Sequence, residues 1–138
     1  MNYSALATWT PRVLSVLRFV TGLLFIEHGT SKLFAMPHNP NFDTLQLFSL
    51  IGLAGCLETV GGALVLIGLF TRPVAFILSG EMAFAYWMAH APKHAFPVMN
   101  GGDPAILYCF IFLYLFFAGG GEWSVDALIG RSRSTASA

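Results

Sequence analysis

The sequence predicts an all-α integral membrane protein, built as a bundle of four transmembrane helices. Hydrophobic residues make up 56% of the chain and charged residues only 10%, whereas a soluble domain usually carries about 25% charged residues. Four apolar segments separated by polar, proline-containing stretches are the second observation. Glycines inside those segments are the third, because an interior glycine costs a soluble helix about 1 kcal/mol but lets membrane helices approach closely. A length of 138 residues predicts a single domain over residues 1–138.

The first span is expected over residues 13–34, a stretch that would extend about 33 Å as a helix. It is too long and too polar for the apolar part of a signal peptide, so we expect it to be retained. Trp9 just before it is typical of a membrane interface. Two prolines predict a loop over residues 35–45, and the second span follows over residues 46–70.

The second half of the chain repeats this alternation. Thr71-Arg72-Pro73 predicts a tight turn, with Pro73 at the first position of a third span over residues 73–91. Three prolines and a glycine pair predict a loop over residues 92–104, and a fourth span follows over residues 105–121. The remaining tail, 122–138, is expected to be disordered from Arg131 onward.

Four spans would place both termini on one side of the membrane. Arginines gather on that side, at positions 12, 72, 131 and 133, whereas Lys32 and Lys93 lie on the other. The positive-inside rule therefore predicts a multi-pass protein of the bacterial cytoplasmic (inner) membrane with cytoplasmic N- and C-termini.

An acidic residue, Glu58, stands near the middle of the glycine-rich second span. At 100° per residue it shares a helix face with Gly55, Gly62, Leu66 and Leu69, where helices are expected to pack tightest. A charge at the centre of a bilayer costs at least about 2.5–3.5 kcal/mol, so such a residue is a functional candidate. The alternative is a hydrogen-bonded Glu that only holds helices together.

Two further acids, Glu27 and Glu81, are expected at the same depth. The centres of the first three spans fall near residues 24, 58 and 82, which puts the three carboxylates within about 5 Å of one another in depth. They need cations nearby. The candidates are Arg18, His28 and Lys32, and we expect Arg18 to pair with Glu58 at a polar centre that His28, Lys32 and Glu81 line.

This group of residues predicts a pocket that binds a small lipophilic molecule with a polar head group and exchanges protons with it. A quinone head group fits, because it needs hydrogen-bond donors and acceptors beside an apolar path. Tyrosines and a histidine of the third and fourth spans would add partners: Tyr86, His90, Tyr108 and Tyr114. The structural alternative is a hydrogen-bonded network that fixes the register of the bundle.

Other classes of site find little support. Pro92 separates His90 from His94 and breaks the helical face that a metal-binding pair would need, and we expect neither a metal site nor a flavin motif. Scattered basic residues and zero net charge argue against nucleic-acid binding. Cys56 and Cys109 lack the C-x-x-C spacing of a redox dithiol and are expected to be packing residues.

An ordered set of short motifs resembles the DoxX family of small four-helix membrane proteins. The set comprises Arg18, His28-Gly29-x-x-Lys32-Leu33-Phe34, Glu58-x-x-Gly61-Gly62, Gly68-Leu69-Phe70-Thr71-Arg72, Gly101-Gly102 and Gly119-x-Gly121-x-Trp123-Ser124-Val125-Asp126. Glu27 and Asp103 depart from the family pattern, which has an apolar residue and a Glu there. The resemblance implies a subunit of a membrane oxidoreductase. Relatives are associated with thiosulfate–quinone oxidoreduction, with quinone stress and with complexes that contain superoxide dismutase and a sulfurtransferase.

The leading functional prediction is therefore a quinone-interacting subunit of a membrane oxidoreductase system. Glu58, Arg18 and Glu81 would react with the ligand, and four residues would bind it: His28, Lys32, Glu27 and Tyr86. One alternative is a non-enzymatic scaffold that docks soluble redox proteins through the cytoplasmic turn and tail, and another is a carrier of small solutes or protons. The expected partners are the lipid bilayer and redox proteins, and a homo-oligomer is compatible with the sequence.

Overall fold

The computed structural model describes residues 3–136, and every regular element in that range is helical. This confirms the predicted all-α class. The elements are α1 (Tyr3–Phe34), the 3-10 turn η1 (Pro40–Phe42), α2 (Leu50–Ile67), α3 (Thr71–Ala85), the π-helical segment η2 (Tyr86–His90), α4 (Pro97–Asn100), α5 (Asp103–Ala118) and α6 (Val125–Ala136).

Several boundaries differ from the predicted ones. Helix α1 begins ten residues before the expected start at residue 13 and contains Pro11 in its interior. The turn after α2 lies at Gly68–Phe70, because Gly68 ends α2 in the left-handed conformation (φ 71°), which glycine adopts without steric cost. Helix α3 consequently begins at Thr71 rather than Pro73.

The C-terminal tail is a second difference. Disorder was expected from Arg131 onward, but α6 continues as a helix to Ala136. Residues 137 and 138, the end of the predicted tail, lie outside the described residues. The four-residue helix α4 also interrupts the loop predicted over residues 92–104.

Two helices of the described chain, α1 and α2, are long and apolar enough to cross a membrane. The predicted third span is divided between α3 and η2, and the fourth corresponds to α5, with 16 residues. The helices thus account for the four predicted apolar segments, and the four-span bundle itself stays a prediction.

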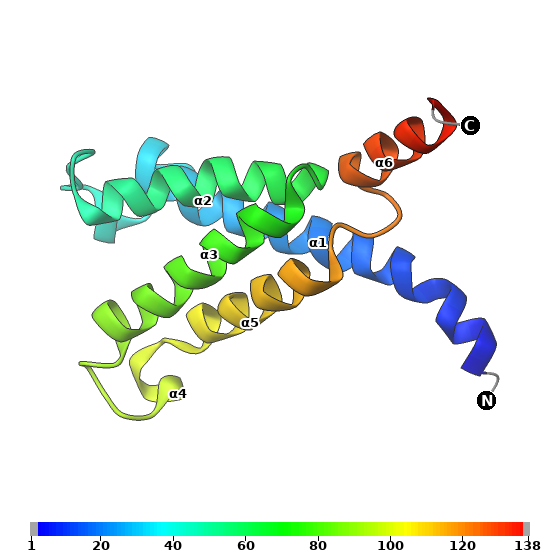
Figure 1. Cartoon of the computed structure of the whole chain (residues 1–138). Coiled ribbons are helices and arrows are strands. Elements are labelled where there is room, and N and C mark those ends of the chain that lie inside the picture. The colour runs from blue at the N-terminus through cyan, green and yellow to red at the C-terminus, as the bar shows by residue number, and fades with distance from the viewer. Residues whose placement is uncertain (1–2, 137–138) are drawn as a thin grey trace.

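The helices form two antiparallel pairs, α1 with α2 and α3 with α5. Figure 1 shows the pairs close together near the α2–α3 turn and diverging toward the loops that follow α1 and precede α5. Both ends of the described chain, together with α6, lie at the end opposite those loops. The molecule thus has a closed end, near the termini, and an open end, near the two loops.

The surface is more apolar than the surface of a soluble protein of this size. Large apolar side chains such as Phe48, Trp87 and Phe117 are exposed, whereas the buried set includes the polar residues Arg18 and Glu58. Soluble proteins rarely expose contiguous apolar surface on this scale. In a bilayer the hydrocarbon chains cover that surface. Together with the apolar helices α1 and α2, this distribution indicates a membrane protein.

Glycines fix how α1 lies against α2. A Cβ at Gly22 would fall 2.6 Å from the backbone nitrogen of Leu66, and one at Gly62 would fall 2.9 Å from Cγ1 of Ile26. Gly55 and Glu58 are buried on the same face of α2 as Gly62. The predicted glycine-lined packing face is therefore confirmed for these residues.

The same contacts correct the predicted depths. Gly22 lies beside Gly62 and Leu66, and Gly29 lies beside Gly55 and Thr59. Glu58 is therefore level with residues near 30 of α1, not with residue 24. The error is about six residues, or about 9 Å along the helix. The centres of the two helices are not level, because α1 extends well past the end of α2.

Candidate functional site

A cavity of about 780 Å³ lies between the two helix pairs, toward the open end of the molecule. Its volume is within the range of sites that bind small molecules. All four long helices contribute to its wall, together with η2 and loop residues. The polar and aromatic side chains among them are Phe25, His28, Lys32, Asn41, Phe42, Glu58, Glu81, Phe84, His90, Lys93 and Tyr108.

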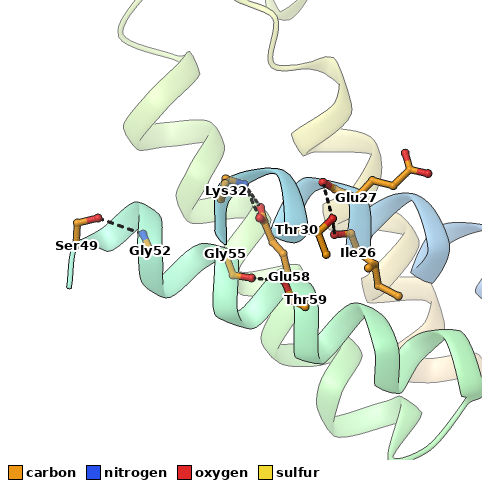
Figure 2. A network of polar contacts seen from close by, with 9 residues as sticks. All are labelled: Ile26, Glu27, Thr30, Lys32, Ser49, Gly52, Gly55, Glu58 and Thr59. Atoms are coloured by element: carbon orange, nitrogen blue, oxygen red, sulfur yellow. Dashed lines mark hydrogen bonds and ion pairs between the residues drawn. The ribbon is translucent and has the colours of Figure 1, made fainter. Parts of the chain in front are cut away.

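The ion pair between Lys32 and Glu58 forms one part of this wall. The Lys32 ammonium donates to both carboxylate oxygens of Glu58, and its distance to Oε1 is 2.5 Å. Figure 2 shows Lys32 reaching from α1 across to Glu58 on α2. The side chains are only 13% and 5% exposed, respectively. Burial makes the two charges depend on each other, because either one alone would be strongly destabilising.

Glu81 is the exceptional residue of the cavity. Both of its carboxylate oxygens are buried, and neither has a hydrogen-bond partner within residues 3–136. A buried polar group without a partner costs about 1–3 kcal/mol, more if charged, and such groups in folded proteins call for an explanation. A ligand that donates a hydrogen bond from inside the cavity would provide one.

Stacked rings form the wall between α1 and α5. The Tyr108 ring lies 5.1 Å from that of Phe25 and 5.7 Å from that of His28, measured between centroids. Tyr108 also stacks on Phe112 at 5.9 Å. These contacts hold Tyr108 in place at the edge of the cavity, where its hydroxyl is available as a hydrogen-bond donor or acceptor.

The π-helical segment η2 lies beside the same cavity. The backbone N–H of Ala91 donates to the carbonyl of Tyr86 over 2.9 Å, five residues back. Met88, Ala89 and His90 of this region line the cavity. Short π-helical segments occur frequently at functional sites, because they rotate the following side chains relative to an α-helix.

Arg18 lies elsewhere, and the predicted pairing of Arg18 with Glu58 is wrong. Its guanidinium donates to backbone carbonyls of Val65 (2.5 Å), Leu66, Gly120 (2.8 Å) and Trp123 (2.8 Å). Lys32, which does pair with Glu58, lies fourteen residues further along α1, or about 21 Å. Arg18 meets the C-terminal end of α2 instead, where carbonyls lack helical partners and attract cations.

Two other side chains strengthen this closed end. The carboxylate of Asp126 accepts from the backbone N–H groups of Phe70 (2.9 Å) and Thr71 (2.8 Å), at the start of α3. Arg72 donates to the carbonyls of Phe116 (2.9 Å) and Phe117 (2.6 Å), at the end of α5. Side chains thus provide hydrogen-bond partners for the unpaired backbone groups of the helix ends that meet there.

Two of the predicted ligand-binding residues are not part of the cavity wall. Glu27 is exposed, and Figure 2 shows its side chain pointing away from α2. Tyr86 packs against Trp87, 5.5 Å between ring centroids, and lies beside Gly102. Tyr108 lines the cavity in place of Tyr86. Spacing alone does not distinguish the two tyrosines, since their positions depend on how α3 and α5 pack.

Within residues 3–136 no group of three or more metal-binding side chains comes together. His90 Nδ1 lies 3.1 Å from the carbonyl oxygen of Asn100, while His94 Nδ1 accepts from the N–H of Phe96 at 3.1 Å. The two histidines therefore have separate local partners.

Comparison with known proteins gives a family and two relatives. The sequence profile of the DoxX family matches residues 13–91. An "Uncharacterized protein" of Haemophilus influenzae is 40% identical over 125 residues, covering 88% of this chain and 93% of the relative. The "Putative oxidoreductase CatD" of Bacillus subtilis is 37% identical over 71 residues, which cover 46% of this chain and 49% of that protein. No solved structure is significantly similar to this chain.

Proposed function

This chain belongs to the DoxX family, and we propose that it is a membrane subunit of an oxidoreductase system that binds a quinol between its two helix pairs. The observation that carries the proposal is the Glu81 carboxylate, which is buried, belongs to a residue of the cavity wall and has no hydrogen-bond partner in the described part of the chain. The name of the Bacillus subtilis relative supports the oxidoreductase class.

A quinol head group matches the chemistry of the cavity. One phenolic hydroxyl would donate a hydrogen bond to Glu81 and pass its proton to a carboxylate oxygen there. The ring would pack against Tyr108 and Met82, both of which line the cavity, and the Tyr108 hydroxyl would bond the second quinol oxygen. This protein would bind the quinol and accept one proton at Glu81. A redox cofactor of a partner protein would take the two electrons, and the second hydroxyl proton would pass to water as the quinone forms.

Lys32 and Glu58 would hold the polar end of the site in place. Their ion pair is buried and crosses from α1 to α2, so it fixes the part of the wall that these two helices form. An ammonium has three N–H donors, which leaves Lys32 able to contact a ligand oxygen as well. Arg18 donates hydrogen bonds to four carbonyls away from the cavity. It would therefore stabilise the fold without contacting the ligand.

We also propose that four segments cross the bacterial cytoplasmic membrane and that both termini lie in the cytoplasm. Helix α3 and η2 together run from residue 71 to 90, about 30 Å and enough to cross. The shorter α5 would span with local thinning of the bilayer. Arg12, Arg72 and Arg131 at the closed end, against Lys93 at the open end, support this orientation.

Replacing Glu81 by Leu tests the ligand site. In lipid nanodiscs Glu81→Leu should weaken quinol binding by about tenfold or more, equivalent to about 1.4 kcal/mol. Without ligand the same variant should be more stable than the parent, since it removes a buried carboxylate that lacks a partner. The measurements are equilibrium quinol binding and thermal unfolding. Glu27→Leu is the matched control, an acid of α1 outside the cavity wall, and should bind quinol normally.

Unchanged quinol affinity in Glu81→Leu would contradict the proposed role of Glu81. Loss of stability in that variant would instead favour the structural interpretation, in which Glu81 supports the bundle.

A scaffold that docks soluble redox proteins is the second candidate, and α6 favours it. This helix extends from the closed end, away from the helix pairs (Figure 1), and exposes Leu128 and Ile129. Removing residues 128–138 should then abolish assembly into a larger membrane complex on native gels, while quinol affinity stays normal. An unchanged complex would argue against docking through α6.

A further inference from the structure

We infer that the ligand enters the cavity sideways from the bilayer, between the first half of α2 and the second half of α3, and that it carries a long apolar tail. The inference rests on the proposed function, because it takes Glu81 as the binding point of the polar head group. It adds the route of entry and the chemical class of the ligand, an amphiphile drawn from the membrane rather than a solute from water.

The wall between α2 and α3 is apolar and reaches the outer surface. Leu50 and Ile51 of α2 line the cavity and are 67% and 51% exposed. Phe84 of α3 and Met88 of η2 also line it and are 55% and 61% exposed. Side chains that face both a cavity and the surface mark its opening. We call these four residues the portal.

Packed rings line the opposite wall, between α1 and α5, although His28 on this side is exposed. Phe25 of α1 is 1% exposed, and its ring contacts that of Tyr108 on α5. The Tyr108 ring also meets the His28 ring edge-on. Ala105 of α5 lines the cavity here and is buried. A ligand entering on this side would have to separate the stacked rings.

The two ends of the cavity differ from the portal in their side chains. Toward the loops, the ring of Phe42 lies over the Lys32 ammonium, 5.5 Å from Nζ to the ring centroid. Toward the closed end, Val65, Leu78 and Phe112 are fully buried and belong to the hydrophobic core. Other exposed lining residues, Asn41, Lys93 and Gly101, lie in the loops. The portal is therefore the apolar opening of the cavity, and it faces the surface that lipid would cover.

The order of polar and apolar groups specifies the shape of the ligand. The acceptors, Glu58 and Glu81, lie on the cavity wall, and the portal residues are entirely apolar. A polar head group bound at Glu81 would leave its apolar tail lying through the portal into the hydrocarbon, where it stays out of water. A ligand without a tail would gain nothing from the portal.

Two quinols with the same head group separate the portal from the head-group site: one without a tail and one with a ten-carbon alkyl tail. The test variant is Ile51→Trp with Met88→Trp, which narrows the portal from both helices. The matched control is Leu53→Trp with Ile77→Trp, since both positions are exposed on α2 and α3 and neither lines the cavity. Binding is measured in nanodiscs, with thermal unfolding as the check on folding.

The parent should bind the tailed quinol about tenfold or more tightly than the tailless one. The portal variant should weaken the tailed quinol about tenfold and the tailless one less than about threefold, while the control changes neither. Equal weakening of both quinols, or no change in either, would overturn the portal. A parent that binds neither quinol would overturn the proposed function instead. If the variant with two Trp substitutions does not fold, the milder variant Ile51→Phe with Met88→Phe takes its place. It should also weaken the tailed quinol more than the tailless one, by a smaller factor.

Discussion

At the scale of single residues, the buried charges of this protein form two separate groups. Lys32 neutralises Glu58 at the cavity, whereas Arg18, 2% exposed, satisfies carbonyls at the closed end. A guanidinium suits the second task, because its planar fork presents five donors in fixed directions. An ammonium suits the first, as a compact charge beside a single carboxylate.

The pairing of Glu58 with Lys32 leads to a prediction from double variants. Glu58→Gln should lower the free energy of unfolding by about 3–5 kcal/mol, because it leaves the Lys32 charge buried and unpaired. Adding Lys32→Met should restore most of that stability, whereas adding Arg18→Met should lower it further. Thermal or denaturant unfolding of the three variants in one detergent gives the comparison. Rescue by Arg18→Met instead of Lys32→Met would contradict the pairing in the structure.

At the scale of helices, glycine contacts determine the position of α1 against α2. Gly22, Gly29, Gly55 and Gly62 bring the two backbones so close that a Cβ at any of them would crowd the partner helix. Helices in a membrane associate through this kind of packing, because lipid offers no hydrophobic force to drive them together. The position of the Lys32–Glu58 pair, and so of the cavity wall, depends on this contact.

Substitution at Gly62 tests the contact between the helices. Gly62→Leu should destabilise the protein by about 1–3 kcal/mol or more, because the added side chain meets Ile26 on α1. Ala63→Leu is the matched control, since Ala63 is the next residue of α2 and is exposed. It should change stability by less than about 0.5 kcal/mol. Equal loss of stability in the two variants, measured by thermal unfolding in detergent, would rule out Gly62 as a packing position.

At the scale of the whole molecule, one end is held together and the other is open. Arg18, Arg72 and Asp126 satisfy helix ends near the termini, whereas the cavity separates the helix pairs toward the loops. The two helix pairs are therefore fixed relative to each other at the closed end. A ligand between them at the open end would add contacts there and leave the hydrogen bonds of the closed end unchanged.

The proposed orientation of the molecule predicts which positions react with a membrane-impermeant thiol reagent. In a background of Cys56→Ser with Cys109→Ser, a cysteine at His38 in the first loop should react in intact cells. A cysteine at Gly130 in α6, an exposed position with open space around it, should react only after the membrane is opened. The opposite pattern would reverse the orientation. Reaction of both positions in intact cells would contradict the expected number of spans.

The sequence by itself determined the all-α class, the four apolar segments, the packing face of α2 and the family. These features follow from composition and from the spacing of residues within one segment. Both are properties of residues that are close together along the chain. Glu58 and Glu81 were also identified this way, because a carboxylate inside an apolar segment is costly wherever the helix lies.

Only the tertiary structure decided how those segments meet. The glycine contacts set the register of α1 on α2, and a shift of about 9 Å replaced Arg18 by Lys32 as the partner of Glu58. The packing of α3 against α5 placed Tyr108, and not Tyr86, at the cavity, and the Glu81 carboxylate has no hydrogen-bond partner among residues 3–136. Register and rotation depend on contacts between residues far apart in the chain, and spacing within one helix carries no information about them.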